Sequence, residues 1–554
     1  MIKDELRAAI RQALVACYQQ QDLDSGEIPE EIQLEVPKNP DHGEYATNLA
    51  MLLARAEKKS PRQIAERLTA VLQKSELLEK VEIAGPGFIN FRLSPACWAA
   101  TLHRVLADGA NYGRSEVGRG TKIQVEFVSA NPTGPLHIGH GRGAVVGDAL
   151  AAILQAAGFD VQREYYINDA GNQVQTLGRS ILARLRQLQG ESVEFPEDGY
   201  QAEYVAELAA GLRQEQGGLT GLDDAEAVAR CAGYGVAEVL KWIATDLEAF
   251  GITFDNWYSE QSLYDRKLVD YELDRLRQKG LTFEADQALW LRTTDFGDDK
   301  DRVLIKSDGS YTYFASDVAY HLEKFERGFD RVIDVWGADH HGYIPRMKAM
   351  LKGFGLPADA LEVLLIQMVN LLRDGEPFVM GKRSGNFITL REVIDEVGRD
   401  ACRFFFLMRR CDSQLDFDLE LAKQQNSDNP VYYVQYAHAR ICSINRNADE
   451  AGIPMPDRDQ FDFSQLSLEE EVALIRQLAR FPEALEGAAL HYEPHRLVFY
   501  LQELAAALHS YYNRHRVLVE DVRVSQARLY LVNAVRTVLA NALRILGVSA
   551  PERM

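Results

Sequence analysis

The first twenty residues show a helical repeat of apolar positions. Apolar side chains recur every three or four residues and form one stripe: Ile2, Leu6, Ile10, Leu14 and Cys17. This spacing predicts an amphipathic helix over residues 2–20. Further helices are expected to begin at Tyr45 and at Pro61, because proline is tolerated in the first turn of a helix.

Residues 81–93 show a different pattern, with two apolar runs on either side of a Gly-Pro-Gly sequence at 85–87. Glycine and proline together mark a turn, so the pattern predicts two strands. Phe88 and Asn90 then lie on one side of the second strand. Residues 1–112 are therefore expected to form a small α+β domain.

The middle of the chain alternates short apolar runs with polar turns and helical segments. This order is typical of a parallel sheet whose strands are joined by helices. The expected strands lie near residues 125–128, 163–168, 310–317, 330–336 and 361–372. Residues 113–415 are therefore predicted to form a Rossmann-type parallel-sheet α/β domain. A mostly helical and more acidic segment, about 174–300, is expected to be an insertion in it.

Residues 416–554 have helical periodicity throughout. Apolar residues at this spacing are most simply the interior of an all-α helix bundle, with a solvated polar rim. The chain is thus predicted to contain three domains, with boundaries near residues 112 and 415.

The composition is typical of a globular protein, with 46% apolar and 26% charged residues. No apolar run approaches the length of a membrane span, so no membrane partner is expected. The N-terminus lacks the apolar core of a signal peptide, and the six cysteines never form Cys-x-x-Cys. These features predict a cytoplasmic protein without bound zinc, and we expect it to be a monomer.

The formal net charge of −21 argues against a general affinity for nucleic acid. The charge is unevenly distributed. Residues 1–110 hold 13 basic and 16 acidic residues, and residues 420–554 hold 14 and 17. A polyanionic partner is therefore expected to contact local basic patches, chiefly near the two ends of the chain.

Residues 125–148 carry the strongest chemical pattern. An apolar strand is followed by a loop rich in proline and glycine and then by His137-Ile-Gly-His140 at a helix start. Free N–H groups at a helix N-terminus bind anions, and neutral histidines can donate to phosphate without a fixed charge. Alternatively, the histidines only cap the helix and the glycines only pack it. The preceding strand makes a phosphate site the better interpretation.

A basic loop at residues 377–386 contains adjacent Lys382 and Arg383 between glycines. Such a loop can neutralise the charge on a pyrophosphate leaving group. A solvated basic turn is the alternative, and composition alone favours it.

Two acidic residues stand at the ends of expected elements. Glu126 lies on the first strand of the middle region, and Asp317 stands near the start of a helix. Helix capping alone would account for Asp317. If the two carboxylates converge, they would suit a guanidinium, whose planar fork matches paired carboxylates, and Tyr313 could add an aromatic face.

Aromatic and basic residues are interleaved near both ends of the chain, as in surfaces that bind unpaired nucleotides. Phe88 could stack on a base and Asn90 could contact the base edge, although a buried core position is an equal alternative. In the helical region, the candidates for phosphate contact are His438, Arg440, Arg514 and Arg516.

These motifs resemble those of class I aminoacyl-tRNA synthetases, and in particular the arginyl-tRNA synthetase family. The histidine pair resembles the HIGH signature, and the basic loop resembles the KMSKS signature with departures at Val379 and Gly381. The Gly-Ala-Asp-His sequence at 337–340 is similar to the segment that contacts the adenosine ribose and the amino acid. The two terminal regions resemble the domain that contacts the tRNA elbow and the DALR-type anticodon-binding bundle.

The resemblance implies that the chain activates arginine with ATP and magnesium and then transfers the arginyl group to its tRNA. ATP would be bound by His137, Gly139, His140, Gly337, Asp339 and Lys382, with His137, His140 and Lys382 catalytic. Arginine would be bound by Glu126, Ser129, Asn131, Tyr313 and Asp317. The tRNA would be contacted by Phe88, Asn90, His438, Arg440, Arg514 and Arg516. No metal site formed by protein side chains is expected.

Two other functions share part of this pattern. A nucleotidyltransferase acting on a small acid or phosphorylated substrate would use the same histidine chemistry, but it rarely needs a long all-helical region. A non-catalytic tRNA-binding relative of a synthetase would not need His137, His140 and Lys382 to be intact.

Overall fold

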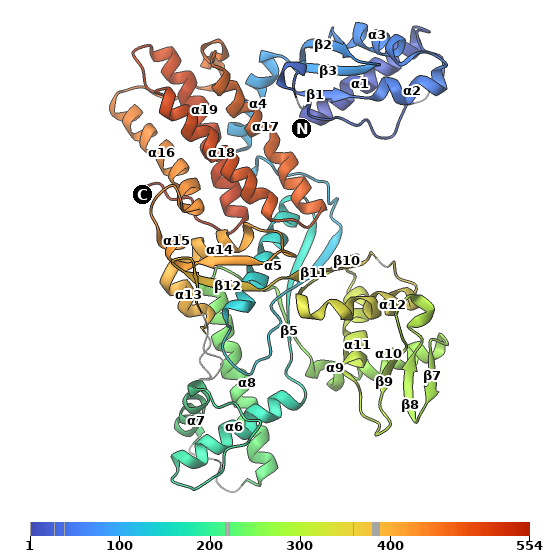
Figure 1. Cartoon of the computed structure of the whole chain (residues 1–554), viewed down its shortest axis with the longest axis vertical. Helices are drawn as coiled ribbons and strands as arrows, with labels where there is room; N and C mark the ends of the chain where they lie inside the picture. The colour runs from blue at the N-terminus through green and yellow to red at the C-terminus, as the bar shows by residue number, and fades with distance from the viewer. Residues whose placement is uncertain are drawn as a thin grey trace.

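The computed structural model describes residues 2–26, 28–37, 39–216, 219, 222–357, 359–378 and 388–554. A small N-terminal domain and a helix bundle lie at one end of the molecule, and an α/β domain lies below the bundle (Figure 1). Two further lobes extend from the α/β domain at the opposite end.

The N-terminal domain packs helices on a three-stranded antiparallel sheet with the strand order β1-β3-β2. Its elements are α1 (Ile2–Gln19), β1 (Tyr45–Thr47), α2 (Leu49–Glu57), α3 (Pro61–Leu72), β2 (Leu78–Ala84) and β3 (Phe88–Leu93). The predicted first helix and the two predicted strands are confirmed. The predicted start of the next helix at Tyr45 is wrong. Tyr45–Thr47 pair with β3 as a strand, and the helix begins only at Leu49.

The α/β domain is built on a five-stranded parallel sheet with the order β11-β10-β4-β5-β6. The strands are β4 (Lys122–Glu126), β5 (Asp160–Ile167), β6 (Asn256–Ser259), β10 (Arg331–Gly337) and β11 (Leu361–Ile366). Helix α5 (Ile138–Ala156) joins β4 to β5. The predicted Rossmann-type parallel sheet is therefore confirmed.

The segment expected to be a mostly helical insertion is only partly so. Its first half forms α6 (Asn172–Leu188), α7 (Glu203–Gln216) and α8 (Asp224–Ala249). Strand β6 also falls inside this segment, yet it belongs to the main sheet, where Tyr258 stacks on Tyr166 of β5. A four-residue strand has too few positions to show its own periodicity, so only its pairing with β5 reveals it.

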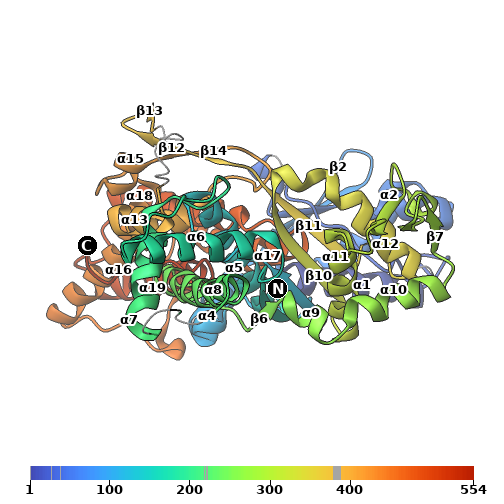
Figure 2. The same ribbon diagram turned by 90° about the horizontal axis from the view of Figure 1, so that it is seen from below.

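The rest of this segment, together with residues up to Phe354, forms the second lobe, which lies apart from α6–α8 in two views (Figures 1 and 2). A small antiparallel sheet in it has the order β7-β8-β9. The lobe contains α9 (Gln261–Asp265), α10 (Leu268–Gln278), β7 (Thr282–Ala285), β8 (Ala288–Leu291), β9 (Arg302–Ile305), α11 (Tyr313–Glu326) and α12 (Ile344–Phe354). The sequence predicts a strand running into a helix over residues 310–317. The helix is confirmed, because α11 begins at Tyr313, but in place of the strand Tyr311 makes an isolated bridge with Ile305.

Two fully buried arginines fix helix α5 to distant parts of the chain. Arg142 donates to the backbone carbonyls of Gln367, Arg410 and Ser413 at 2.7–3.0 Å. Arg403 donates to the carboxylate of Asp148 on α5 and to the carbonyl of Leu546 near the end of the chain. The position of the histidine pair at the start of α5 therefore depends on contacts made more than 200 residues away.

The remainder of the chain leads into the helix bundle. The connecting elements are β12 (Val369–Arg373), β13 (Glu376–Pro377), α13 (Leu390–Val397), α14 (Arg399–Leu407), β14 (Leu415–Asp418) and α15 (Leu419–Lys423). The bundle consists of α16 (Pro430–Glu450), α17 (Glu469–Leu490), α18 (His495–Arg514) and α19 (Val522–Ile545), and α4 (Pro95–Asp108) packs against it. The helical prediction for the end of the chain is confirmed, apart from the last residues of β14.

Candidate active site

The two signature histidines form a closed turn at the start of α5. His137 is the N-cap of the helix, and its Nδ1 accepts from the backbone N–H of Gly139 at 3.1 Å. His140 Nδ1 in turn accepts from the backbone N–H of His137 at 3.3 Å. A side chain at Gly139 would lie 2.8 Å from the His137 ring, so glycine is required there.

Both imidazoles are half-buried rather than enclosed in the interior. Their ring centroids lie 3.8 Å apart. Burial lowers the pKa of His137, and burial together with the charge of His137 lowers the pKa of His140 to about 3. Because Nδ1 of each ring accepts a hydrogen bond, the neutral rings carry their proton on Nε2, where each can donate. The turn is thus suited to a phosphate chain, and it caps the helix as well.

The chain that follows the basic loop returns to this turn. The backbone of Thr389 pairs with His137, and Leu390 donates its N–H to the carbonyl of Leu136 at 2.8 Å. Lys382, Val379 and Gly381 lie outside the described residues, so the role assigned to Lys382 stays a prediction.

Strand β4 ends in a strained turn. Val128 and Ser129 have φ values of 70° and 40°, a region that residues with a Cβ rarely occupy. The turn brings Ser129 Oγ back to donate to Glu126 Oε1 at 2.9 Å and to accept from the N–H of Tyr166 at 3.1 Å. Asn131 lies on the exposed loop beyond it and donates to Gln173 Oε1 at 2.7 Å.

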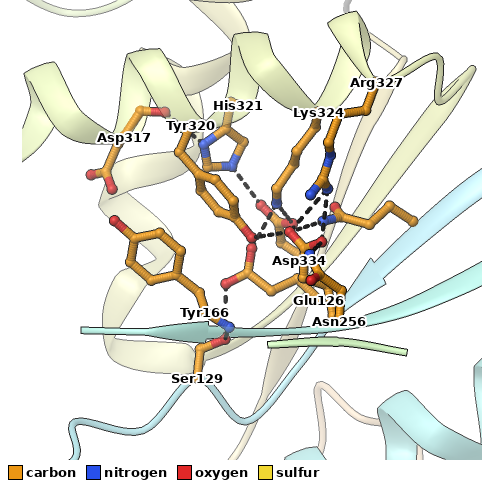
Figure 3. A network of polar contacts seen from close by, with 12 residues as sticks. Glu126, Ser129, Tyr166, Asn256, Asp317, Tyr320, His321, Lys324, Arg327 and Asp334 are labelled. Carbon is orange, nitrogen blue, oxygen red and sulfur yellow. Dashed lines mark hydrogen bonds and ion pairs between the residues drawn. The ribbon is translucent and has the colours of Figure 1, made fainter. Parts of the chain in front are cut away.

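Side chains from three strands meet one face of α11 behind Glu126 (Figure 3). The strands contribute Glu126, Glu164 and Asp334, and the helix contributes Tyr320, His321, Lys324 and Arg327. Lys324 Nζ donates to Glu126 at 2.6 Å and to Asp334 at 2.9 Å. Arg327 pairs with Glu164 at 2.8 Å.

Asp334 is a fully buried acceptor in this network. Burial alone would raise its pKa, but Lys324 and His321 outweigh burial and lower the pKa to about 2. His321 faces an acceptor at both ring nitrogens, the Asp317 carbonyl and the Asp334 carboxylate, each at 2.8 Å. Glu126 and Asp334 are thus paired with the ammonium of Lys324, and Glu164 is paired with the guanidinium of Arg327.

The side chain of Asp317 lies outside this set of ion pairs. It accepts a hydrogen bond from the hydroxyl of Tyr343, and it makes no ion pair within the part of the chain that the structure describes. Burial and, to a smaller extent, the charge of Glu126 raise the pKa of Asp317. Convergence of the two carboxylates on one ligand stays a prediction. Tyr313 lies one helical turn before Asp317 and is 73% exposed.

Glu260 is a further carboxyl group in this region. It is buried just after β6, and burial, Asp317 and Asp169 raise its pKa to about 7. Burying a carboxyl group without a cation is costly unless a partner arrives or a proton binds. A cationic ligand would remove this cost.

The segment at the carboxyl end of β10 is open to solvent. Gly337 and Asp339 are exposed, and a short 3₁₀ helix spans Ala338–Tyr343. This is the edge at which open parallel sheets bind ligands, the same edge as the turn after β4. Within the described residues, no group of three or more His, Cys, Asp or Glu side chains is arranged to hold a metal ion.

The candidates for nucleic acid contact divide into exposed and buried residues. Arg514 and Arg516 are exposed, and Arg440 lies over the rings of Tyr436 and Tyr512 at 4.6 and 4.8 Å. The prediction for His438 is wrong, because this residue is only 6% exposed and its Nδ1 contacts the carbonyl of Pro551.

In the N-terminal domain, Phe88 is half-buried at the start of β3. Asn90 is buried in the middle of that strand, where a nucleotide base cannot reach its side chain without local opening. The core alternative therefore applies to Asn90, whereas Phe88 keeps both interpretations.

Sequence reasoning missed Lys324, Asp334, Glu164 and Glu260. One pattern could have shown the first of them: Asp317, His321 and Lys324 follow at intervals of four and three residues on one helical face. Three ionisable residues on the face of a helix that covers a sheet predict buried polar partners. The three acids offer no such pattern, because each lies on or just after a different strand and their spacing in the sequence does not show that they meet.

Among the described residues, no helix has the length and apolar content needed to span a membrane.

Three family models match the chain. The model described as the arginyl tRNA synthetase N terminal domain matches residues 3–93, and the class I tRNA synthetase (R) catalytic domain matches residues 101–204 and 237–412. The DALR anticodon binding domain matches residues 434–554.

The chain is similar to curated proteins along its whole length. It is 63% identical to the arginine–tRNA ligase of Syntrophotalea carbinolica and 54% identical to that of a Geobacter species, with full coverage of each chain. Among solved structures, the arginyl-tRNA synthetase of Thermus thermophilus matches with a TM-score of 0.76, 25% identity and full coverage of both chains.

Proposed function

The chain belongs to the arginyl-tRNA synthetase family, and on this premise we propose which of its residues carry out the ligation of arginine to tRNA. The reaction uses ATP. An oxygen of the arginine carboxylate attacks the α-phosphate, the bond to the β-phosphate breaks, and pyrophosphate leaves. A ribose hydroxyl at the 3′ end of the tRNA then attacks the carbonyl of the adenylate, and AMP leaves.

The ATP end of the site is the turn of His137, Gly139 and His140. Both imidazoles are neutral and donate from Nε2, so they bind phosphate oxygens and stabilise the negative charge that grows during attack. The N–H groups at the start of α5 add to this effect. Gly337 and Asp339 are proposed to contact the adenosine, and Lys382 is proposed to bind the departing pyrophosphate.

The arginine end is the pocket between the turn after β4 and the start of α11. The observation that carries the proposal is Asp317, a carboxylate that accepts from the hydroxyl of Tyr343 and lacks an ion pair among the described residues. We place it with Glu126, whose charge contributes to the raised pKa of Asp317. A guanidinium supplies a cation and a planar set of donors for both acids. Ser129 and Asn131 are proposed to bind the amino and carboxylate groups, and the exposed Tyr313 is proposed to cover the side chain.

The tRNA is proposed to contact both ends of the chain, through Phe88 in the N-terminal domain and through Arg440, Arg514 and Arg516 in the bundle. The domain boundaries near residues 112 and 415 remain part of this proposal. ATP is proposed to arrive with magnesium, with no zinc held by the protein. We further propose that the enzyme is a monomer that acts in the cytoplasm.

ATP–pyrophosphate exchange, measured with each amino acid in the presence and absence of tRNA, tests the assignment. Exchange with arginine and with no other amino acid supports the proposed pocket. Exchange with another acid and not with arginine would indicate a nucleotidyltransferase of different specificity. Binding of tRNA without any exchange would indicate a non-catalytic relative. The matched control is D317N, in which an amide of similar shape replaces the unpaired carboxylate.

A further inference from the structure

The buried ammonium of Lys324 joins two strands of the sheet to helix α11. The residue is fully buried, and its Nζ donates to Glu126 on β4 and to Asp334 on β10 at 2.6 and 2.9 Å. Burial acts to lower the pKa of Lys324, but the acids Asp334, Glu126 and Glu164 outweigh it and raise the pKa above its ordinary value. The lysine is therefore charged. It is the one side chain that links Glu126 to Asp334 in this network.

Glu126 is held at both of its oxygens. Ser129 Oγ donates to Oε1 at 2.9 Å, and Lys324 donates to Oε2 at 2.6 Å. Two donors at two oxygens fix the plane of the carboxylate, whereas a single donor leaves it free to rotate. A planar, bidentate ligand gains most from an acceptor whose orientation is already set.

We propose that Lys324 is a positioning residue for the amino-acid substrate: it holds the Glu126 carboxylate in the orientation that meets the guanidinium. This inference rests on the assignment of Glu126 to the arginine pocket. Lys324 lies behind Glu126, on the side of the sheet and α11, and it acts on the substrate only through that carboxylate (Figure 3).

A comparison with Arg327 separates positioning from simple stabilisation. Arg327 stands three residues further along α11 and pairs with Glu164. Glu164 is fully buried and also accepts from Gln124, Asn256 and Tyr320, so its oxygens are occupied within the protein. The side chain of Glu126 keeps 9% exposure. Both cations stabilise the fold, but Lys324 holds the acid that we assign to the arginine pocket, whereas Glu164 is fully enclosed.

The test is ATP–pyrophosphate exchange with the full-length variant K324M, whose unbranched side chain fills a similar volume without charge. We expect the KM for arginine to rise about 10- to 100-fold, the cost of losing one partner of a buried charged contact. The KM for ATP is expected to stay within about twofold of the wild-type value, because the histidine turn does not contact Lys324. R327M is the matched control. We expect it to have a lowered melting temperature and an unchanged KM for arginine.

The double variant K324M/D334N keeps the experiment decisive if K324M alone does not fold. It removes one charge of each sign, and the amide oxygen introduced at position 334 retains an acceptor for His321. A selective rise in the KM for arginine in either folded variant supports the proposal. An unchanged KM for arginine, an equal rise in the KM for ATP, or a failure of both variants to fold would overturn it.

The wild-type control separates this inference from the proposed function. If the wild-type enzyme does not use arginine, the proposed pocket itself fails. If it uses arginine and both Lys324 variants keep their KM, only the positioning role fails.

Discussion

The histidine turn and the carboxylate pocket lie at the same edge of the sheet, yet they are built in opposite ways. The turn takes four consecutive residues, His137 to His140, and is closed by hydrogen bonds within those residues. The proposed pocket takes Glu126, Asp317 and Glu260 from segments far apart in the sequence, and Lys324 pairs with Glu126. The turn has no charge of its own, whereas the pocket depends on charge throughout.

This difference suits the ligand that we propose for each part. Pyrophosphate must leave after the reaction, so neutral donors serve the ATP end better than permanent cations would. A guanidinium must be distinguished from other side chains, and buried carboxylates do so because they are costly without a matching cation. Substitutions at the two ends should therefore change different kinetic constants.

The largest effect is expected for D317N. The variant keeps the shape of the side chain and an acceptor for the Tyr343 hydroxyl, but it removes the unpaired charge. We expect kcat/KM for arginine to fall about 1000-fold, or ~4 kcal/mol, as for truncation of a buried charge pair. Exchange kinetics at varied arginine measure this. A loss of less than tenfold, or an equal change in the KM for ATP, would contradict the assignment.

The second largest effect is expected for H140A. We expect kcat to fall about 100-fold, as for the loss of one transition-state donor, with the KM for arginine nearly unchanged. H140N is the matched control: its amide oxygen can still accept from the N–H of His137, so the helix cap is kept. Both variants should lose rate, and only H140A should also lose thermal stability. Full activity of H140A would rule out the proposed chemistry of the turn.

The two ends should also differ in their response to pH. Glu260, with a pKa raised to about 7, is charged above that pH and neutral below it, so the pocket loses negative charge as the pH falls. We expect kcat/KM for arginine to fall about tenfold between pH 8 and pH 6. E260Q should remove this dependence. His140, with its pKa of about 3, stays neutral between pH 6 and pH 8 and therefore adds no pH dependence to the rate in this range. A pH profile of E260Q identical to that of the wild type would exclude Glu260.

The smallest effect is expected for Y343F. The hydroxyl of Tyr343 donates to Asp317, and its loss removes one donor from an acid that keeps its charge. We expect kcat/KM for arginine to fall about fivefold, or ~1 kcal/mol, with kcat for saturating substrates unchanged. Steady-state exchange at limiting arginine is the measurement. A loss as large as that of D317N would mean that the hydroxyl, and not the carboxylate, governs recognition.

The sequence alone determined the parts of this protein that are local. The strand, loop and helix around His137 and His140 could be predicted because the residues that form them are neighbours and their hydrogen bonds stay within one turn. The parallel sheet and the helical end followed from periodicity over long segments. Glu126 and Asp317 were found as candidates, but nothing in their spacing showed that they converge.

Only the tertiary structure decided the rest. Strand β6 is too short to carry a pattern, and the strand at Tyr45 exists because β3 lies beside it. The burial of His438 and Asn90 depends on what packs over them, and Lys324 becomes charged and central only because two acids from different strands reach it. A buried charge is stable only when charged or hydrogen-bonding partners lie beside it. Here the pairing of the strands positions those partners, because it brings distant parts of the chain together.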